Sequence, residues 1–419
     1  MNKFRGLCKS PMWFVALLLA AVVAGCGGGG GGGVGSGGAG SGAAVLPGAA
    51  GTTGAAATDP TVRSASPSDG ATNVPTSTSG SGAAPIVTGT LVTATFSEVM
   101  NPLTVTPTGT FTLKEKVSGT NVPGTVTMNA GSTIATFTPT AAALLVSTEY
   151  TATVSTAAKN AGGTAMPNAV SWSFTTGSAL NTGQSNLDLG TADTYALFAG
   201  AGINLAITGT PSRIVGDVGQ VPAAACNGCN VLPALPETIV GVLHQNDAPA
   251  IQARNDYEAA YVDGLTRATN SCVLAAPADI SAAQGACGGN FSPGTPGPVF
   301  GPGLYRSASP IGFTGTITLD AGGNPDAVFI FQSDATIEPA VNSTVVLAGL
   351  AQAKNIWWIA GTAVTINLGA TFKGTVIASD GATVGVGSTA GAPATVEGRV
   401  FSRTAGATVG EFTTITVPQ

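Results

Sequence analysis

The chain has 419 residues, enough for two or three domains, and only 9% of them are charged, against about 25% in an average soluble domain. With 60 glycines and a mean hydropathy of +0.34, this composition excludes a coiled coil, a charged disordered chain and a conventional helical enzyme. The formal net charge of −6 argues against nucleic-acid binding, and a single histidine, His244, leaves no set of histidines for catalysis or metal binding.

The N-terminal segment has the organisation of an export signal. Positive charges within the first nine residues precede an uncharged run over residues 11–25, which is shorter than the ~20 apolar residues of a spanning helix and predicts a signal peptide at 1–25. The small residues before Cys26 resemble the bacterial lipobox. This resemblance implies acylation of Cys26 and an outward-facing outer-membrane lipoprotein, because Gly27 rather than Asp follows. An ordinary secretory signal is the alternative.

Residues 26–57 contain seven consecutive glycines and consist almost entirely of Gly, Ala, Ser and Thr. Such a stretch buries too little apolar surface to offset the conformational entropy lost on folding. We therefore predict a flexible tether that starts at the lipidated cysteine and spans about 30 Å as a coil.

The region 58–177 contains short runs in which apolar and polar residues alternate, and Pro, Gly and Asn separate them. This pattern predicts an antiparallel β-sandwich. The runs are Val92–Phe96, Thr125–Met128, Thr133–Phe137, Tyr150–Val154 and Val170–Phe174. The landmarks Ser66–Ala71, Phe96–Met100 and Trp172–Thr176 resemble the bacterial Ig-like domain of surface-layer and adhesive proteins, which implies a spacer here; residues 178–186 follow as a linker.

From 187 to 419 the pattern is repetitive: an apolar strand, a short Ala-Thr element and a closing strand recur. The apolar strands are Val328–Gln332, Ile356–Ala360, Thr375–Ala378 and Arg399–Ser402. The closing strands are Ser343–Leu347, Ala370–Lys373, Ala394–Glu397 and Thr414–Val417. The Ala-Thr elements carry Thr336, Thr365, Thr383 and Thr408, spaced by 29, 18 and 25 residues. This spacing predicts three short strands per coil of a β-solenoid.

One segment, 247–269, has a helical pattern. Asp247 can cap the helix, and Pro249 suits its first turn. One apolar face is formed by Ala250, Ala253, Tyr257, Ala260, Tyr261, Leu265 and Ala268. We expect that face to pack against the flank of the solenoid.

Several landmarks of the region 187–419 occur in the order found in the microbial ice-binding protein family. They include Gly216–Gly219, Pro302–Tyr305, Asn324–Gln332, Ala353–Trp358 and Glu397–Arg399. The region resembles that family, which implies a discontinuous β-solenoid with a long helix alongside and a flat face that adsorbs to ice, with no catalytic activity and no cofactor. The predicted fold class is mainly β: an Ig-like sandwich, then a three-faced right-handed β-solenoid with one long helix.

Alternation around Thr365 places its apolar neighbours inside and its hydroxyl outside, and the same register exposes Thr336, Thr383 and Thr408. The family's ice face commonly carries Thr-Ala/Gly-x-Thr/Asn, which Thr362–Thr365 matches in full. Glu338 and an irregular second column depart from that pattern. The resemblance thus implies an ice-binding face that carries Thr336, Thr362, Thr365, Thr383, Thr404 and Thr408.

Two other classes of function compete with ice binding. In an adhesin or envelope structural protein, the same solenoid binds protein or glycan without ice activity. An enzyme such as a β-helical polysaccharide lyase needs clustered charges, whereas the charges here are scattered. G-x-S-x-G, P-loop and EF-hand motifs are absent from the sequence.

Four cysteines lie in the C-terminal region, and in an exported chain they predict disulfides with three alternative pairings. We favour Cys272–Cys287, combined with a Cys226–Cys229 bridge or with its cross-linked alternative. A single C-x-x-C pair does not make a common zinc site, so no metal is expected. His244 has no second histidine or cysteine at ligand spacing, and we interpret it as incidental.

Overall fold

The computed structural model describes most of the chain beyond residue 58. The described residues are 59–79, 87–178, 182–206, 209–229, 238–268, 271–276, 278–282, 284, 290–291 and 296–419. The predicted signal peptide 1–25, the lipidation site Cys26, the tether to residue 57 and Cys287 lie outside them. Within these ranges, each helix is too short or too polar to cross a lipid bilayer.

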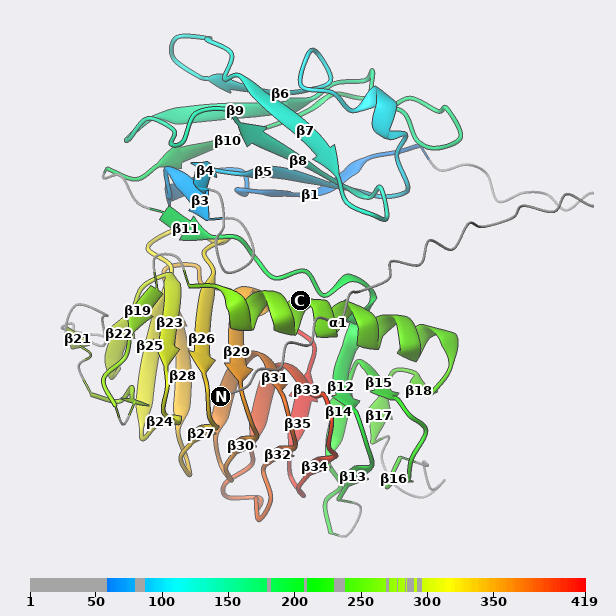
Figure 1. Cartoon of the computed structure of the whole chain (residues 1–419), viewed down its shortest axis with the longest axis vertical. Coiled ribbons are helices and arrows are strands. Elements are labelled where there is room, and N and C mark those ends of the chain that lie inside the picture. Colours follow the sequence, from blue (N-terminus) through cyan, green and yellow to red (C-terminus); the bar gives the residue numbers. More distant parts are fainter. Residues whose placement is uncertain are drawn as a thin grey trace, which may run out of the picture. The chain divides into compact units, whose positions relative to one another are not determined.

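The first folded region is the predicted β-sandwich (Figure 1). One sheet has the order β1-β5-β8-β7 and the other β2-β10-β9-β6. The strands are β1 (Val62–Ser66), β2 (Ala71–Val74), β5 (Val92–Phe96), β6 (Phe111–Glu115), β7 (Gly124–Met128), β8 (Ile134–Pro139), β9 (Glu149–Val154) and β10 (Val170–Thr176). All pairs are antiparallel except β2 with β10. Alternate residues enter a core that contains Phe111, Phe137 and Trp172, as the alternation predicts.

The linker contributes a strand of its own. Strand β11 (Thr182–Gln184) pairs parallel with β3 (Ser77–Ser79), which also pairs with β4 (Val87–Gly89). A 3-10 turn, η1 (Pro102–Thr104), is capped by Asn101, whose side chain accepts a hydrogen bond from the Leu103 N–H. The alternation in the sequence does not reveal these short elements, because three residues are too few to show a period.

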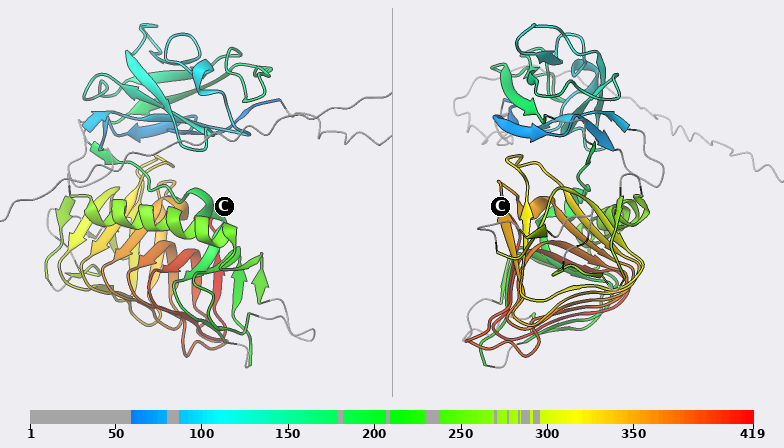
Figure 2. Two further views of the ribbon diagram at one scale, coloured as in Figure 1. Left: turned by 45° about the vertical axis from the view of Figure 1, so that its right-hand side comes forward. Right: turned by 90° about the vertical axis from the view of Figure 1, so that its left-hand side faces the viewer.

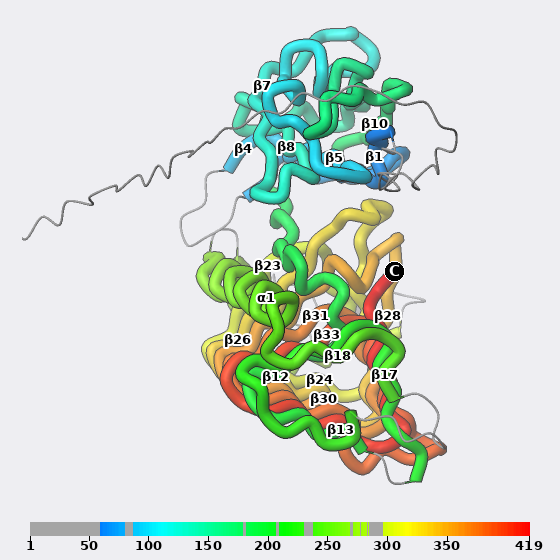
Figure 3. Tube along the Cα trace, turned by 90° about the vertical axis from the view of Figure 1, so that its right-hand side faces the viewer, coloured from blue at the N-terminus to red at the C-terminus, as the bar shows by residue number. Residues whose placement is uncertain are grey.

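The second folded region is a β-solenoid whose coils have three sides, visible end-on in Figure 3. The helix face consists of β12 (Tyr195–Ala199), β15 (Asp217–Gln220), β18 (Leu243–Gln245), β19 (Ser271–Val273), β23 (Gly303–Ser307), β26 (Phe329–Ser333), β29 (Ile356–Ala360) and the C-terminal halves of β31 (Thr371–Ala378) and β33 (Thr395–Ser402). The short-strand face consists of β13 (Ile203–Leu205), β16 (Cys226–Asn227), β20 (Ala278–Asp279), β24 (Ile311–Phe313), β27 (Ile337–Pro339), β30 (Val364–Ile366), β32 (Ala382–Val384) and β34 (Ala407–Val409).

The third face completes each coil. It consists of β14 (Arg213–Val215), β17 (Ile239–Val240), β22 (Pro298–Phe300), β25 (Thr316–Asp320), β28 (Thr344–Ala348), the N-terminal halves of β31 and β33, and β35 (Thr414–Thr416). At one end, β21 (Asn290–Phe291) pairs antiparallel with β22. Strands β31 and β33 turn from the third face to the helix face at Gly374 and Gly398, where a Cβ on Gly398 would overlap the Gly374 carbonyl oxygen.

The solenoid is discontinuous along the chain. After a 3-10 turn, η2 (Gly190–Thr194), the first coil stacks on the last one: β12, β13 and β14 pair with β33, β34 and β35. The chain then crosses from β18 at one end of the helix face to β19 at the other. Helix α1 (Ala248–Thr266) makes most of this crossing, since 19 residues of helix reach about 28 Å and neighbouring strands are ~4.8 Å apart.

Helix α1 packs on the strands of the helix face (Figure 2). The Asp247 side chain caps it by accepting the Ala250 N–H at 3.0 Å, as predicted. The buried residues of α1 are Ala250, Ala253, Tyr257, Ala260, Tyr261 and Gly264. Strand β29 is covered by the helix on one side and by the solenoid interior on the other, so all five of its residues are buried. This explains why the strands of the helix face are continuous apolar runs in the sequence.

The interior of the solenoid contains a stack of aromatic rings. Tyr305, Phe331 and Trp358 are in register on consecutive strands, with centroid distances of 4.9 and 4.3 Å between neighbours. Phe372 extends the stack at 5.0 Å from Trp358. This dense core stiffens the strands whose outer sides form the short-strand and third faces.

Candidate functional site

The short-strand face presents one outward residue per strand. Val364 and Ile366 are buried on either side of Thr365, and the same buried–half-buried–buried pattern surrounds Thr383 and Thr408. The order of strands across the face is β16-β13-β34-β32-β30-β27-β24-β20. The central side chains therefore form one column across the stacked coils.

Three threonines of this column are in register, as the sequence predicts: Thr365 pairs with Thr383, which pairs with Thr408. The column continues to Asn204, paired with Thr408, and then to Asn227. These five consecutive positions carry no charge. Because β-branched threonine has restricted χ1 freedom and the ladder fixes the backbone at ~4.8 Å per strand, the hydroxyls and methyls form a stiff, regular row.

The expected place of Thr336 in this column is wrong. Ile337 pairs with Val364, so Glu338 takes the position next to Thr365, and Thr336 lies two residues before it, beside Ala363. The side chain of Glu338 is exposed. The corner between β26 and β27 is as long as the one between β29 and β30. The error arises because Ala335 lies in that corner, whereas Ala382 and Ala407 of the similar Ala-Thr pairs are inward strand residues.

The second predicted column is irregular, as the motif comparison indicates. Thr362 lies three residues before Thr365, but Asp380 occupies the equivalent position before Thr383, and its N–H donates to the Thr362 carbonyl at 3.0 Å. Thr404 lies four residues before Thr408, and its hydroxyl donates to the Ser379 carbonyl at 2.8 Å and to Asp380 Oδ1 at 3.2 Å. The structure thus brings Thr365, Thr383 and Thr408 together and leaves Thr336 and Thr404 apart from them.

Cysteines brace the ends of the solenoid. Cys226 and Cys229 form a disulfide with their Cα atoms 5.5 Å apart, which decides between the alternatives left open by the sequence. The bridge lies directly beside Asn227, at the end of the outward column. Cys272 is also disulfide-bonded, and its predicted partner Cys287 lies outside the described residues.

The single histidine has a structural role. His244 Nδ1 lies 2.7 Å from Asp247 Oδ2, and its ring packs 5.5 Å from that of Tyr195. Burial acts to raise the pKa of Asp247, but the hydrogen bonds from His244 and the Ala250 N–H outweigh it and hold that pKa below its usual value. The pair supports the start of α1. Among the described residues, no group of three His, Cys, Asp or Glu side chains could hold a metal ion.

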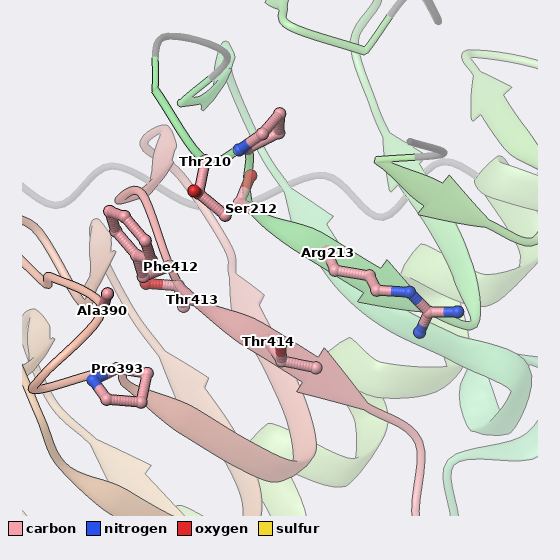
Figure 4. Close-up of a pocket in the computed structure, with 9 residues that line it drawn as sticks. Thr210, Ser212, Arg213, Ala390, Pro393, Phe412, Thr413 and Thr414 are labelled. Carbon is pink, nitrogen blue, oxygen red and sulfur yellow. The ribbon is translucent and has the colours of Figure 1, made fainter. Parts of the chain in front are cut away.

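The hollow shown in Figure 4 does not resemble a catalytic cleft. It has a volume of about 410 Å³ and is lined by Thr210, Pro211, Ser212, Arg213, Ala390, Pro393, Phe412, Thr413 and Thr414. Arg213, whose side chain extends away from Phe412 and Pro393, is the one charged residue of this lining. Without a second titratable group, the hollow offers no acid–base pair.

These features define a discontinuous β-solenoid with a lateral helix and a regular, uncharged outward row. The ice-binding-like family model matches residues 197–415, more than half of the chain, and the chain belongs to this family. The bacterial Ig-like domain model matches residues 56–176.

Named relatives lie in fungi and bacteria. Ice-binding protein K1-A of Typhula ishikariensis is 34% identical over 210 residues, which cover 47% of this chain and 78% of that protein. An ice-binding protein of Flavobacterium frigoris is 29% identical over 244 residues, or 56% of this chain and 77% of that protein. A solved ice-binding protein from an Antarctic biological consortium has 30% identity, a TM-score of 0.47 and coverage of 57% of this chain and 94% of its own. None of these relatives bears the name of an enzyme.

Two features of the faces were not predicted from the sequence. Asn204 and Asn227 extend the threonine column, but their strands precede the helix and their place beside the last coil is a consequence of the discontinuity. The closing strands also carry a threonine each, and the structure aligns these threonines on the third face. Their common position one residue before an inward apolar side chain was the available signal.

Proposed function

We propose that the solenoid binds ice through the short-strand face. The observation that carries the proposal is the in-register row of Thr365, Thr383 and Thr408, extended by Asn204 and Asn227. Membership of the ice-binding-like family and the names of the relatives support ice as the ligand.

The chemistry of this row suits a crystalline water surface. Threonine methyls favour an ordered water layer, and hydroxyls and amides supply hydrogen bonds at a repeat set by the backbone ladder. Little conformational entropy is lost on adsorption, because the side chains are already restricted by their branching and by the packed interior. A flat row of this kind adsorbs to a periodic lattice, whereas mobile charged side chains would favour liquid water.

The acidic side chains define the limits of the proposed surface. Glu338 follows Thr365 in the column, and Asp279 lies at the far end of the same face; both are exposed. The ice-contacting part is therefore the half of the face that carries threonine and asparagine. Asp380, three residues before Thr383, is exposed at the edge of this half of the face.

We also propose that a lipid on Cys26 and the Gly-rich tether hold the protein at the outer surface of the cell envelope. The lipobox-like sequence and the Ig-like domain, a module of surface proteins, support this location. Replacement of the acylated thiol by Cys26→Ser should release the chain into the medium. A variant that stays with the membrane fraction would contradict lipid anchoring.

Incorporation into a slowly growing ice hemisphere tests the ice proposal. We expect the purified chain to be enriched in the ice relative to the liquid, and Thr365→Tyr to lose most of that enrichment because the bulky ring breaks the plane of the row. Thr136→Tyr, a half-buried threonine of the sandwich, is the matched control and should behave like the parent. A folded parent chain that is excluded from ice would instead favour the adhesin or envelope function.

A further inference from the structure

A second and longer threonine row lies on the third face. Thr316 pairs with Thr344, Thr344 with Thr371, Thr371 with Thr395, and Thr395 with Thr414, on five successive strands. At ~4.8 Å per strand the row extends over about 19 Å. It therefore exceeds the threonine row of the short-strand face by two coils.

The side chains of this row point outward. The residue after each threonine is buried in the solenoid interior: Ile317, Val345, Phe372, Val396 and Ile415. All five threonines are half-buried, as are Thr365, Thr383 and Thr408. The two rows thus present the same groups, at the same repeat and with similar exposure.

The neighbouring column of the third face adds little net charge. Two residues after each threonine, the outward positions include Val346 and Thr416, which are uncharged. Lys373 and Glu397 occupy the positions between them and form an ion pair of 2.5 Å across adjacent strands. At the end of the threonine row, Arg213 pairs with Thr414 and is exposed, and the hollow of Figure 4 begins there. A second hollow of about 360 Å³ has Lys373, Thr395, Glu397 and Thr414 in its lining, so the even part of the face includes Thr371 and ends before Thr395.

An apolar corner joins the two faces. Three coils turn from the short-strand face to the third face at the aligned apolar side chains Val341, Leu368 and Val386, whereas the matching position of the last coil holds Glu411. Val341 and Val386 are 50% and 52% exposed. These residues lie between the two threonine rows, and their apolar surface favours contact with ordered water over contact with liquid water.

We propose that the third face is a second ice-contacting surface, which includes Thr371, and that it meets the first at this apolar corner. The inference rests on the proposed function, since it assigns the same ligand to a second face. Ice fits better than a protein or glycan partner because this row repeats the chemistry and spacing of the first and lacks aromatic anchors. Two inclined faces would let one molecule adsorb to differently oriented planes of a crystal.

Fluorescent labelling of a single-crystal ice hemisphere tests this assignment on the full chain. The variants are Thr371→Tyr on the third face, Thr383→Tyr on the short-strand face, and the double variant. Val262→Tyr, at an exposed position of α1, adds the same bulk on the helix side and is the control. Circular dichroism should show a native β spectrum for each, since tyrosine is favourable on exposed strand positions.

We expect each single variant to lose part of the labelled planes and of the thermal hysteresis, and the double variant to lose all of both. A Thr371→Tyr chain with the full set of planes and full activity would overturn the second face while leaving the proposed function intact. Loss on Thr371→Tyr alone, with Thr383→Tyr unaffected, would support this inference and remove the short-strand face from the proposed function. An unlabelled parent chain would overturn both. If Thr371→Tyr misfolds, Thr344→Tyr replaces it with the same expectations.

Discussion

The sandwich and the solenoid both carry rows of threonine, yet they arrange them differently. In the sandwich, Thr93, Thr136 and Thr127 lie side by side on β5, β8 and β7. In the solenoid, Thr365, Thr383 and Thr408 lie side by side on coils of nearly one orientation (Figure 2). Composition and local sequence are similar, so the difference lies in how the strands are stacked.

Twist explains why only one of these rows is suited to a flat ligand. Adjacent strands of a free antiparallel sheet rotate by roughly 20–25°, so the hydroxyls of a sandwich row fan out after two or three strands. A three-sided coil that stacks on its neighbours through interior rings such as Trp358 and Phe331 holds its strands close to parallel. A threonine on a strand therefore does not by itself indicate a binding surface. The stacking of the strands decides whether a row of threonines is flat enough to contact a flat ligand.

The largest expected effect separates the cores of the two regions. Trp358→Ala removes the centre of the interior ring stack and should cost about 3–5 kcal/mol in the free energy of unfolding of the solenoid, with loss of ice activity. Trp172→Ala should destabilise the sandwich by a similar amount and leave the thermal hysteresis unchanged. Calorimetry and thermal hysteresis measured on both variants test this; equal losses of ice activity would contradict it.

A smaller effect concerns the disulfide, which has no counterpart in the sandwich because residues 58–177 contain no cysteine. The double variant Cys226→Ser/Cys229→Ser opens a short loop and should lower the stability of the solenoid by roughly 2 kcal/mol in the chain-entropy description. Because the bridge adjoins Asn227 and not the threonines, most of the thermal hysteresis should remain. Complete loss would show that the asparagine end of the row dominates binding.

Helix capping should give a pH-dependent difference. Asp247→Ala removes the cap of α1 and should cost about 1 kcal/mol. Because the folded state lowers the pKa of Asp247 below its ordinary value of 3.8, the cap contributes its full stability above that pH and loses it as the pH falls through the lower folded value. Asn101, the uncharged cap in the sandwich, is the control: Asn101→Ala should have the same effect at every pH.

The smallest change in stability is expected where the row is lengthened. Glu338→Thr replaces an exposed side chain and should alter the free energy of unfolding by less than about 0.5 kcal/mol. It extends the threonine row from three to four coils and should raise the thermal hysteresis. Glu115→Thr in the sandwich is the control and should leave the thermal hysteresis unchanged. A Glu338→Thr chain with lower activity than the parent would contradict the proposed register of the ice face.

The sequence predicted much of the architecture and only part of the site. Local patterns suffice for the sandwich strands, for Asp247 and the apolar side of α1, and for the inward and outward alternation around Thr365, because each depends on near neighbours. The position of Thr336 depends on whether the alanine before it lies in the corner or faces inward on the strand, and the pairing of Asn204 with Thr408 joins residues from opposite ends of the domain. The third-face row went unnoticed because its threonines acquire a common direction only when five coils are superposed.

Thermal hysteresis of Thr383→Tyr compared with Thr136→Tyr is the sharpest test of whether the short-strand face contacts ice. Both substitutions place the same ring at the same kind of half-buried, central strand position, one on a stacked row and one on a twisted row. We expect a clear loss of activity for Thr383→Tyr and parental activity for Thr136→Tyr, with both chains folded. Parental activity for Thr383→Tyr would contradict this expectation, because the short-strand face would then not be where the protein meets ice.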